Sequence, residues 1–111
     1  MKQEVGYRIW IEGNDGTFLG RGRISLLEQI DSTGSISKAA KALKMSYKKA
    51  WNLVDSMNKE LGEDLVNCTS GGSGGGGTQL TSRGRNAIKN FKVLETKMKA
   101  FAESEFSQIE F

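Results

Sequence analysis

The chain has 111 residues, a formal net charge of +3, one cysteine and no histidine. This length suits one domain (1–111) with a single modest core. Histidine is the commonest general base and metal ligand, and the sequence contains none. Its lone Cys68 cannot form an internal disulfide, and no apolar run could cross a bilayer. We therefore expect a cytoplasmic protein without catalytic residues, metal, cofactor or membrane contact.

The N-terminal segment alternates over 5–12, with Tyr7, Ile9 and Ile11 on one face and Arg8, Trp10 and Glu12 on the other, which predicts a strand with one buried face. A turn at 13–16 and a short return strand then complete a β-hairpin within 5–20. Residues 22–33 follow with helical apolar spacing, and Gly34 is expected to end that helix because glycine accepts the left-handed conformation.

Residues 35–61 predict two amphipathic helices joined by a tight turn. Ser35 and Ser46 are the expected N-caps, because each hydroxyl can accept a hydrogen bond from a free N–H of the first turn. The predicted buried face of the second helix consists of Tyr47, Ala50, Val54, Met57 and Leu61. Trp51 is also assigned to the core, and Asn58 is expected to bond a buried backbone group. Gly62 ends this helix.

Two short strands, near 65–69 and 78–80, flank a run of glycine and serine. Such a run in isolation is typical of a flexible linker. Its position directly after a helix–turn–helix favours a wing over 65–80 instead. Glycine backbone can approach phosphates closely, so Gly74, Gly75 and Gly76 are candidate DNA contacts.

A long helix is expected over 82–111, about 45 Å in length at 1.5 Å per residue. A compact domain of this size, with a radius of gyration near 13 Å, is about 35 Å across and could not cover such a rod. We therefore expect a homodimer, with the alternative that the last turns are a frayed tail. The predicted dimerisation residues are Phe91, Met98, Phe101, Ala102, Phe106 and Ile109.

Five lysines, Lys38, Lys41, Lys44, Lys48 and Lys49, are the only charged residues between Asp31 and Asp55. A helix–turn–helix with no acid among its lysines suits a phosphate backbone, although a solvated helical pair is the plainer alternative. The whole pattern predicts a mainly α fold with a small β component. Its parts are an N-terminal β-hairpin, a winged helix-turn-helix with a Gly-rich wing, and a long C-terminal helix.

Gly34-Ser35-Ile36-Ser37, Met45-Ser46-Tyr47-Lys48, the Ala50-Trp51 pair and the glycine run resemble the N-terminal DNA-binding domain of the ModE family. These proteins are winged-helix regulators of molybdate uptake and molybdenum metabolism. LysR-type helix–turn–helix domains share the wing position but not the glycine run. Lys44 stands where the ModE family usually has glycine, so we expect a left-handed residue or a different turn there.

The resemblance implies sequence-specific binding of double-stranded DNA by a molybdenum-related transcriptional regulator. The family's molybdate-binding domains are not in this sequence, so molybdate sensing is not implied, and a separate sensor subunit stays open. The second helix should enter the major groove with its first residues at the base edges. The expected DNA contacts are Ser35, Ser37, Lys38, Lys41, Ser46, Tyr47, Lys48, Lys49 and Asn52. The alternatives are an RNA-binding winged helix and a protein-interaction module.

Overall fold

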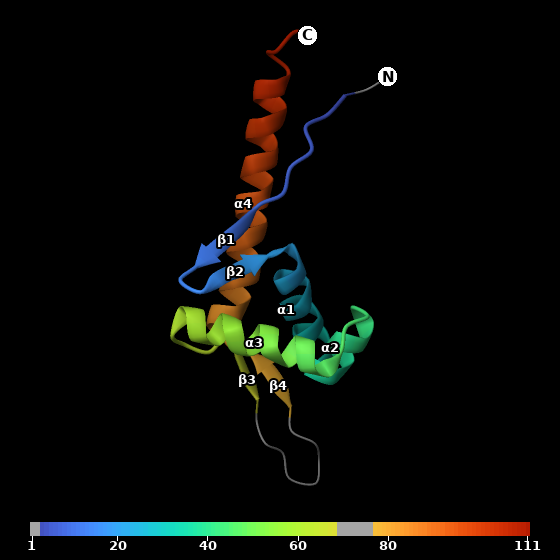
Figure 1. Ribbon diagram of the computed structural model, residues 1–111, viewed down its shortest axis with the longest axis vertical. Coiled ribbons are helices and arrows are strands. Elements are labelled where there is room, and N and C mark those ends of the chain that lie inside the picture. The colour runs from blue at the N-terminus through green and yellow to red at the C-terminus, as the bar shows by residue number, and fades with distance from the viewer. Residues whose placement is uncertain (1–2, 69–76) are drawn as a thin grey trace.

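The computed structural model describes residues 3–68 and 77–111. Most of the described residues lie in helices, and the strands form only two short antiparallel hairpins (Figure 1). The fold is therefore mainly α, as predicted. In chain order the elements are β1 (Trp10–Gly13), β2 (Gly16–Gly20), α1 (Arg21–Thr33), α2 (Ile36–Ala42), α3 (Tyr47–Leu61), β3 (Val66–Cys68), β4 (Thr78–Leu80) and α4 (Ser82–Phe106).

The helix ends follow their local sequence. The side chains of Ser35, Ser46 and Thr81 each accept a hydrogen bond from the backbone N–H three residues later, at 3.0–3.1 Å. Gly34 and Gly62 end α1 and α3 with φ of 69° and 76°, in the left-handed region that glycine adopts without a steric penalty. The predicted caps Ser35 and Ser46 and the predicted ends of α1 and α3 are therefore confirmed.

The core is centred on α1, whose Leu26, Leu27 and Ile30 have no exposed surface. Helix α1 contacts α2, α4, β2 and β4, so it holds the hairpin, the helix–turn–helix and the wing against one another. The other buried apolar residues come from every one of these elements: Leu19, Ile24, Ile36, Ala39, Ala40, Ala50, Val54, Met57, Leu65, Val66, Leu80 and Phe91.

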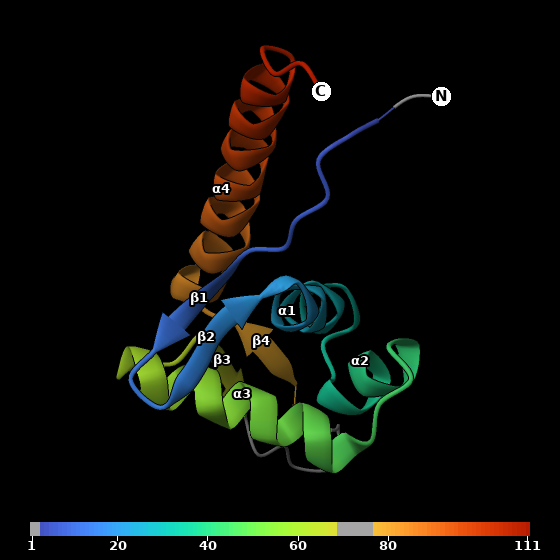
Figure 2. The same ribbon diagram turned by 45° about the horizontal axis from the view of Figure 1, so that its top comes forward.

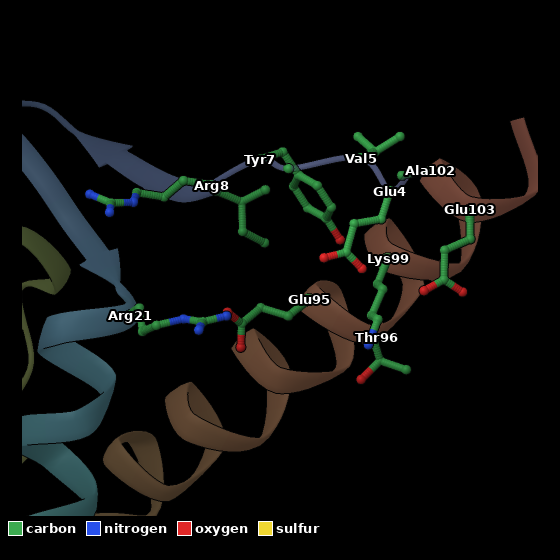
Figure 3. A pocket seen from close by; sticks show the side chains of 12 residues that line it. Glu4, Val5, Tyr7, Arg8, Arg21, Glu95, Thr96, Lys99, Ala102 and Glu103 are labelled. Atoms are coloured by element: carbon green, nitrogen blue, oxygen red, sulfur yellow. The ribbon is translucent and has the colours of Figure 1, made fainter. Parts of the chain in front are cut away.

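The predicted strand over 5–12 is wrong in its first half. Pairing begins at Trp10, which lies opposite Gly20, and Tyr7 is exposed. The reason is that Gly20 ends β2 and α1 begins at Arg21, so β2 offers no partner to residues 5–9. Residues 4–9 lie beside α4 instead and line a groove with it, and in this groove Arg21 and Glu95 form an ion pair at 3.1 Å (Figure 3).

Helix α4 packs only its first half on the core and then projects away from it (Figures 1 and 2). The molecule therefore measures 63 × 30 × 22 Å. Phe91 is 1% exposed and belongs to the core of its own chain, so its assignment to a dimer surface was wrong. The helix also ends at Phe106, five residues before the predicted end at Phe111, and the rings of these two residues then lie 6.2 Å apart.

None of the helices within 3–68 and 77–111 is long and apolar enough to span a membrane.

Candidate nucleic-acid interface

The turn between α2 and α3 carries backbone strain at Lys44. Its φ is 57°, so Lys44 adopts the left-handed conformation that the sequence comparison led us to expect at this position. The amide N–H of Met45 donates to the carbonyl oxygen of Ala40 at 3.0 Å across this turn. Lysine tolerates the left-handed conformation at a cost of about 1–2 kcal/mol. The turn therefore keeps the helix–turn–helix geometry although glycine is absent.

One flank of α3 is fixed to the N-terminal hairpin. The carboxylate of Glu60 accepts hydrogen bonds from the backbone N–H groups of Asn14 and Asp15, both at 2.7 Å. Beside it, Arg23 on α1 donates to the Ser56 hydroxyl at 3.1 Å. Burial lowers the pKa of Arg23, and the negative charge of Glu60 opposes that shift. This flank of α3 is therefore occupied by the chain itself.

The opposite flank of α3 is fixed to the base of the wing. The Asn58 side chain bonds the backbone of Leu65 and Val66, which confirms the expected backbone partner for this half-buried amide. The second wing strand is held as well, because the N–H of Thr78 donates to the carbonyl oxygen of Gly34 at 3.0 Å. The wing base and the helix–turn–helix therefore form one fixed surface (Figure 1).

These two attachments define which side of α3 is open. At about 100° per residue, Asn58 marks the wing flank, Ser56 and Glu60 mark the hairpin flank, and Ala50, Val54 and Met57 face the core. The remaining arc runs from the wing flank across the solvent-facing side. It consists of Tyr47, Lys48, Trp51, Asn52, Asp55 and Lys59.

Two residues predicted to be buried lie on this open arc. Tyr47 is 55% exposed and Trp51 is 46% exposed, whereas Ala50, Val54 and Met57 are buried as predicted. Apolar spacing marks the centre of a helix face, but it does not tell whether a neighbour covers the edge of that face. Both rings lie at the edge, so their assignment to the core was wrong.

The predicted polar contacts share the exposed side of the helix–turn–helix. Ser35 is half-buried as the cap of α2, and the others are exposed: Ser37, Lys38, Lys41, Ser46, Lys48, Lys49 and Asn52. None of the five lysines from 38 to 49 pairs with a carboxylate within the described part of the chain. Asp55, the one acid of the open arc, is paired with Lys59 at 2.9 Å. Gly74, Gly75 and Gly76 lie outside the described residues.

This arrangement defines a winged helix-turn-helix with a cationic exposed face. The chain belongs to the lysR family of bacterial regulatory helix-turn-helix proteins, whose model matches residues 22–85.

Within this class the chain is similar to ModE proteins. It is 46% identical over 88 residues to the molybdenum transport protein ModE of Azotobacter vinelandii, covering 79% of this chain and 33% of that protein. It is 48% identical over 80 residues to the transcriptional regulator ModE of Yersinia pestis, covering 71% of this chain and 30% of that protein. The chain thus spans about a third of the length of these relatives.

The fold is also found among solved structures. The DNA-binding domain in the CbnR_DBD–DNA complex superposes with a TM-score of 0.59 at 18% identity, over 79% of this chain and 97% of that one.

Proposed function

We propose that this chain binds double-stranded DNA through α2, α3 and the wing, as the DNA-binding part of a ModE-type transcriptional regulator in molybdenum-related gene regulation. The observation that carries the proposal is the set of five lysines, from Lys38 to Lys49, that pair with no carboxylate of residues 3–68 and 77–111 and lie on or beside the open arc of α3. Cations without acidic partners attract a phosphate backbone, and an exposed helix face supplies side chains for base edges. The similarity to ModE regulators supports the molybdenum-related role.

The side chains divide into two groups by their place on the helices. Ser46, Tyr47, Lys48 and Asn52 occupy the first turns of α3, which lie nearest the base edges when such a helix enters the major groove. Lysine suits the guanine acceptors and asparagine suits adenine. The others hold phosphates in this proposal: Ser35, Ser37, Lys38, Lys41 and Lys49.

The salt dependence of binding, together with two lysine-to-alanine variants, tests the proposed DNA contact. Lys48→Ala is expected to weaken binding to a selected duplex by about 1–3 kcal/mol if Lys48 contacts a base edge. If it contacts only a phosphate, binding to all duplexes falls alike and the log–log salt slope drops by about 0.9. Lys97→Ala, the same change on an exposed position of α4, is the matched control. Equal affinities for wild type, Lys48→Ala and Lys97→Ala would remove Lys48 from the interface.

Competition separates the two alternatives. An RNA-binding winged helix would be displaced from duplex DNA by structured or single-stranded RNA at lower concentration than by duplex DNA. A protein-interaction module would show no salt-dependent binding to duplex DNA. We expect duplex DNA to be the stronger competitor.

The wing is proposed as a second DNA contact. Replacing residues 74–77 by alanine is expected to lower DNA affinity more than the free energy of unfolding, because close approach to phosphate needs the missing Cβ atoms. Unchanged DNA affinity in a folded variant would show that the segment is a linker and not a DNA contact.

We further propose a homodimer through α4. Leu94, Met98 and Phe101 are exposed and lie three or four residues apart, on one side of the helix. This apolar stripe continues into a cavity of about 410 Å³, whose lining includes Ile11, Phe18, Leu61, Ala87 and Leu94. Of the predicted dimer residues, Ala102 and Phe106 are half-buried, and Ile109 lies beyond the helix end.

Sedimentation tests the dimer. Phe101 is 63% exposed, so Phe101→Asp should leave the fold intact while placing a charge in the apolar stripe. We expect a dimer for wild type and for Thr96→Asp, a control on the side of α4 that faces residues 4–9, and a monomer for Phe101→Asp. A wild-type monomer at tens of micromolar would contradict the proposal.

We propose that any response to molybdate depends on a separate sensor subunit. The lysines from 38 to 49 could attract an oxyanion, but they are already assigned to DNA. Calorimetry with molybdate at moderate salt tests this, and we expect no saturable binding. Tight, saturable binding would contradict it.

A further inference from the structure

Two large aromatic side chains lie exposed on the open arc of α3. Tyr47 and Trp51 are one helical turn apart, so their rings follow the same edge of the helix, the edge nearest the wing. Neither ring stacks on another aromatic ring within residues 3–68 and 77–111. Two such rings side by side form a continuous exposed apolar edge, which is a feature of binding surfaces.

The surroundings of these rings favour a polyanion as the molecule that covers them. Lys48 follows Tyr47 directly, Lys49 is one residue further, and Asn52 follows Trp51. A second copy of the chain would bring the same lysines against these and repel them. The apolar stripe proposed for dimerisation lies instead on α4, the helix that projects away from the core (Figure 1).

The major groove offers one apolar group to such an edge. Thymine presents its C5-methyl group there, and apolar side chains recognise thymine by contact with this methyl. We propose that Tyr47 and Trp51 form an apolar edge of α3 that contacts thymine methyl groups, so that the preferred DNA site contains thymines read through their methyls. The inference rests on the proposed function and adds a base preference that lysine and asparagine do not provide.

Uracil substitution tests this directly, because deoxyuridine differs from thymidine in that one methyl. Duplexes are first selected by wild type from a random library, and each thymine of the selected site is then replaced singly by deoxyuridine. Burial of one methyl is worth about 0.8 kcal/mol, so we expect a loss of about four-fold in affinity at one or two positions. Equal affinity at every position would overturn the inference.

Variants assign the effect to the two rings. If a ring contacts the methyl at a given position, its alanine variant should bind the thymine duplex and the uracil duplex for that position with equal affinity. Tyr47→Ala and Trp51→Ala should each show this at one sensitive position, as in a double-mutant cycle. Trp10→Ala is the matched control, because Trp10 is also exposed, at 52%, but lies on β1. It should keep the full uracil effect. A uracil effect that survives in both α3 variants would overturn the assignment.

Fluorescence gives a second measurement that needs no truncation of Trp51. The chain has two tryptophans, so Trp10→Phe leaves Trp51 as its only one. We expect the Trp51 emission to change in intensity and wavelength when selected duplex saturates the protein. An unchanged spectrum at saturation would contradict a contact.

Failure of the inference can be distinguished from failure of the proposed function. Selective, salt-dependent binding with no uracil effect removes only the thymine contact. Failure to select any duplex overturns the proposed function and this inference together.

Discussion

Asn58 and Val66 exchange hydrogen bonds between α3 and the wing. The Asn58 Nδ2 donates to the Val66 carbonyl oxygen at 3.2 Å, and the Val66 N–H donates back to Oδ1 at 3.4 Å. The same Oδ1 accepts a shorter bond, 2.8 Å, from the N–H of Leu65. One amide side chain thus bonds the backbone on both sides of the start of β3 and ties the first wing strand to α3.

Removal of this amide should destabilise the protein. Asn58→Ala leaves half-buried backbone groups unpaired, and we expect a loss of about 1–3 kcal/mol in the free energy of unfolding. Asn52→Ala, an exposed asparagine on the same helix, should change stability by less than about 0.5 kcal/mol. Urea denaturation measures both. Equal denaturation midpoints for the two variants would show that the Asn58 bonds add no stability.

The Glu60 carboxylate should stabilise the hairpin turn more than a surface ion pair does. Glu60→Ala loses two charge-assisted bonds to Asn14 and Asp15, and we expect a cost of about 1 kcal/mol after allowance for solvent screening. Glu63→Ala breaks only the exposed pair with Arg83 and should cost less than about 0.5 kcal/mol. Thermal unfolding of both variants checks the order, and a larger cost for Glu63→Ala would refute it.

Lys44→Gly should raise stability despite the loss of a side chain. Glycine adopts the observed φ of 57° without strain, and we expect a gain of about 0.5–1 kcal/mol after the extra entropy of the unfolded chain is subtracted. Lys41→Gly removes the same charge from within α2 and should lower stability by about 0.5–1 kcal/mol. Opposite signs in chemical denaturation are the expected outcome; the same sign would mean that Lys44 is unstrained.

Gly84 should be intolerant of even one methyl group. A Cβ atom there would lie 2.3 Å from the backbone oxygen of Leu65, so the wing base or α4 would have to shift. We expect Gly84→Ala to cost about 1–3 kcal/mol. In Gly22→Ala the new Cβ meets no atom within 4 Å in α1, and a gain of about 0.5 kcal/mol is expected. Comparable melting temperatures for the two variants would contradict this.

Local signals predicted most of the fold. Serine caps, glycine helix ends and apolar spacing each depend on a few neighbouring residues, and they placed α1, α2 and α3 correctly. The strand over residues 5–9 failed because pairing needs a partner, and the length of β2 is not visible in the alternation of residues 5–12.

The candidate site shows the same division. Exposure of the lysines and of Asn52 followed from the charge pattern. Exposure of Trp51 and burial of Phe91 did not, because each depends on which element lies beside the helix edge. Periodicity gives a direction around the helix axis, but it does not give the distance along the axis over which the core extends.

The wing is anchored at both ends of its base, by Asn58 at β3 and by Gly34 at β4. Substitution of the segment between Cys68 and Gly77 therefore leaves these hydrogen bonds at the wing base untouched. We therefore expect exchange of these residues to leave the orientation of α3 unchanged. This arrangement favours two separate routes of evolutionary change, one through the exposed residues of α3 and one through the wing.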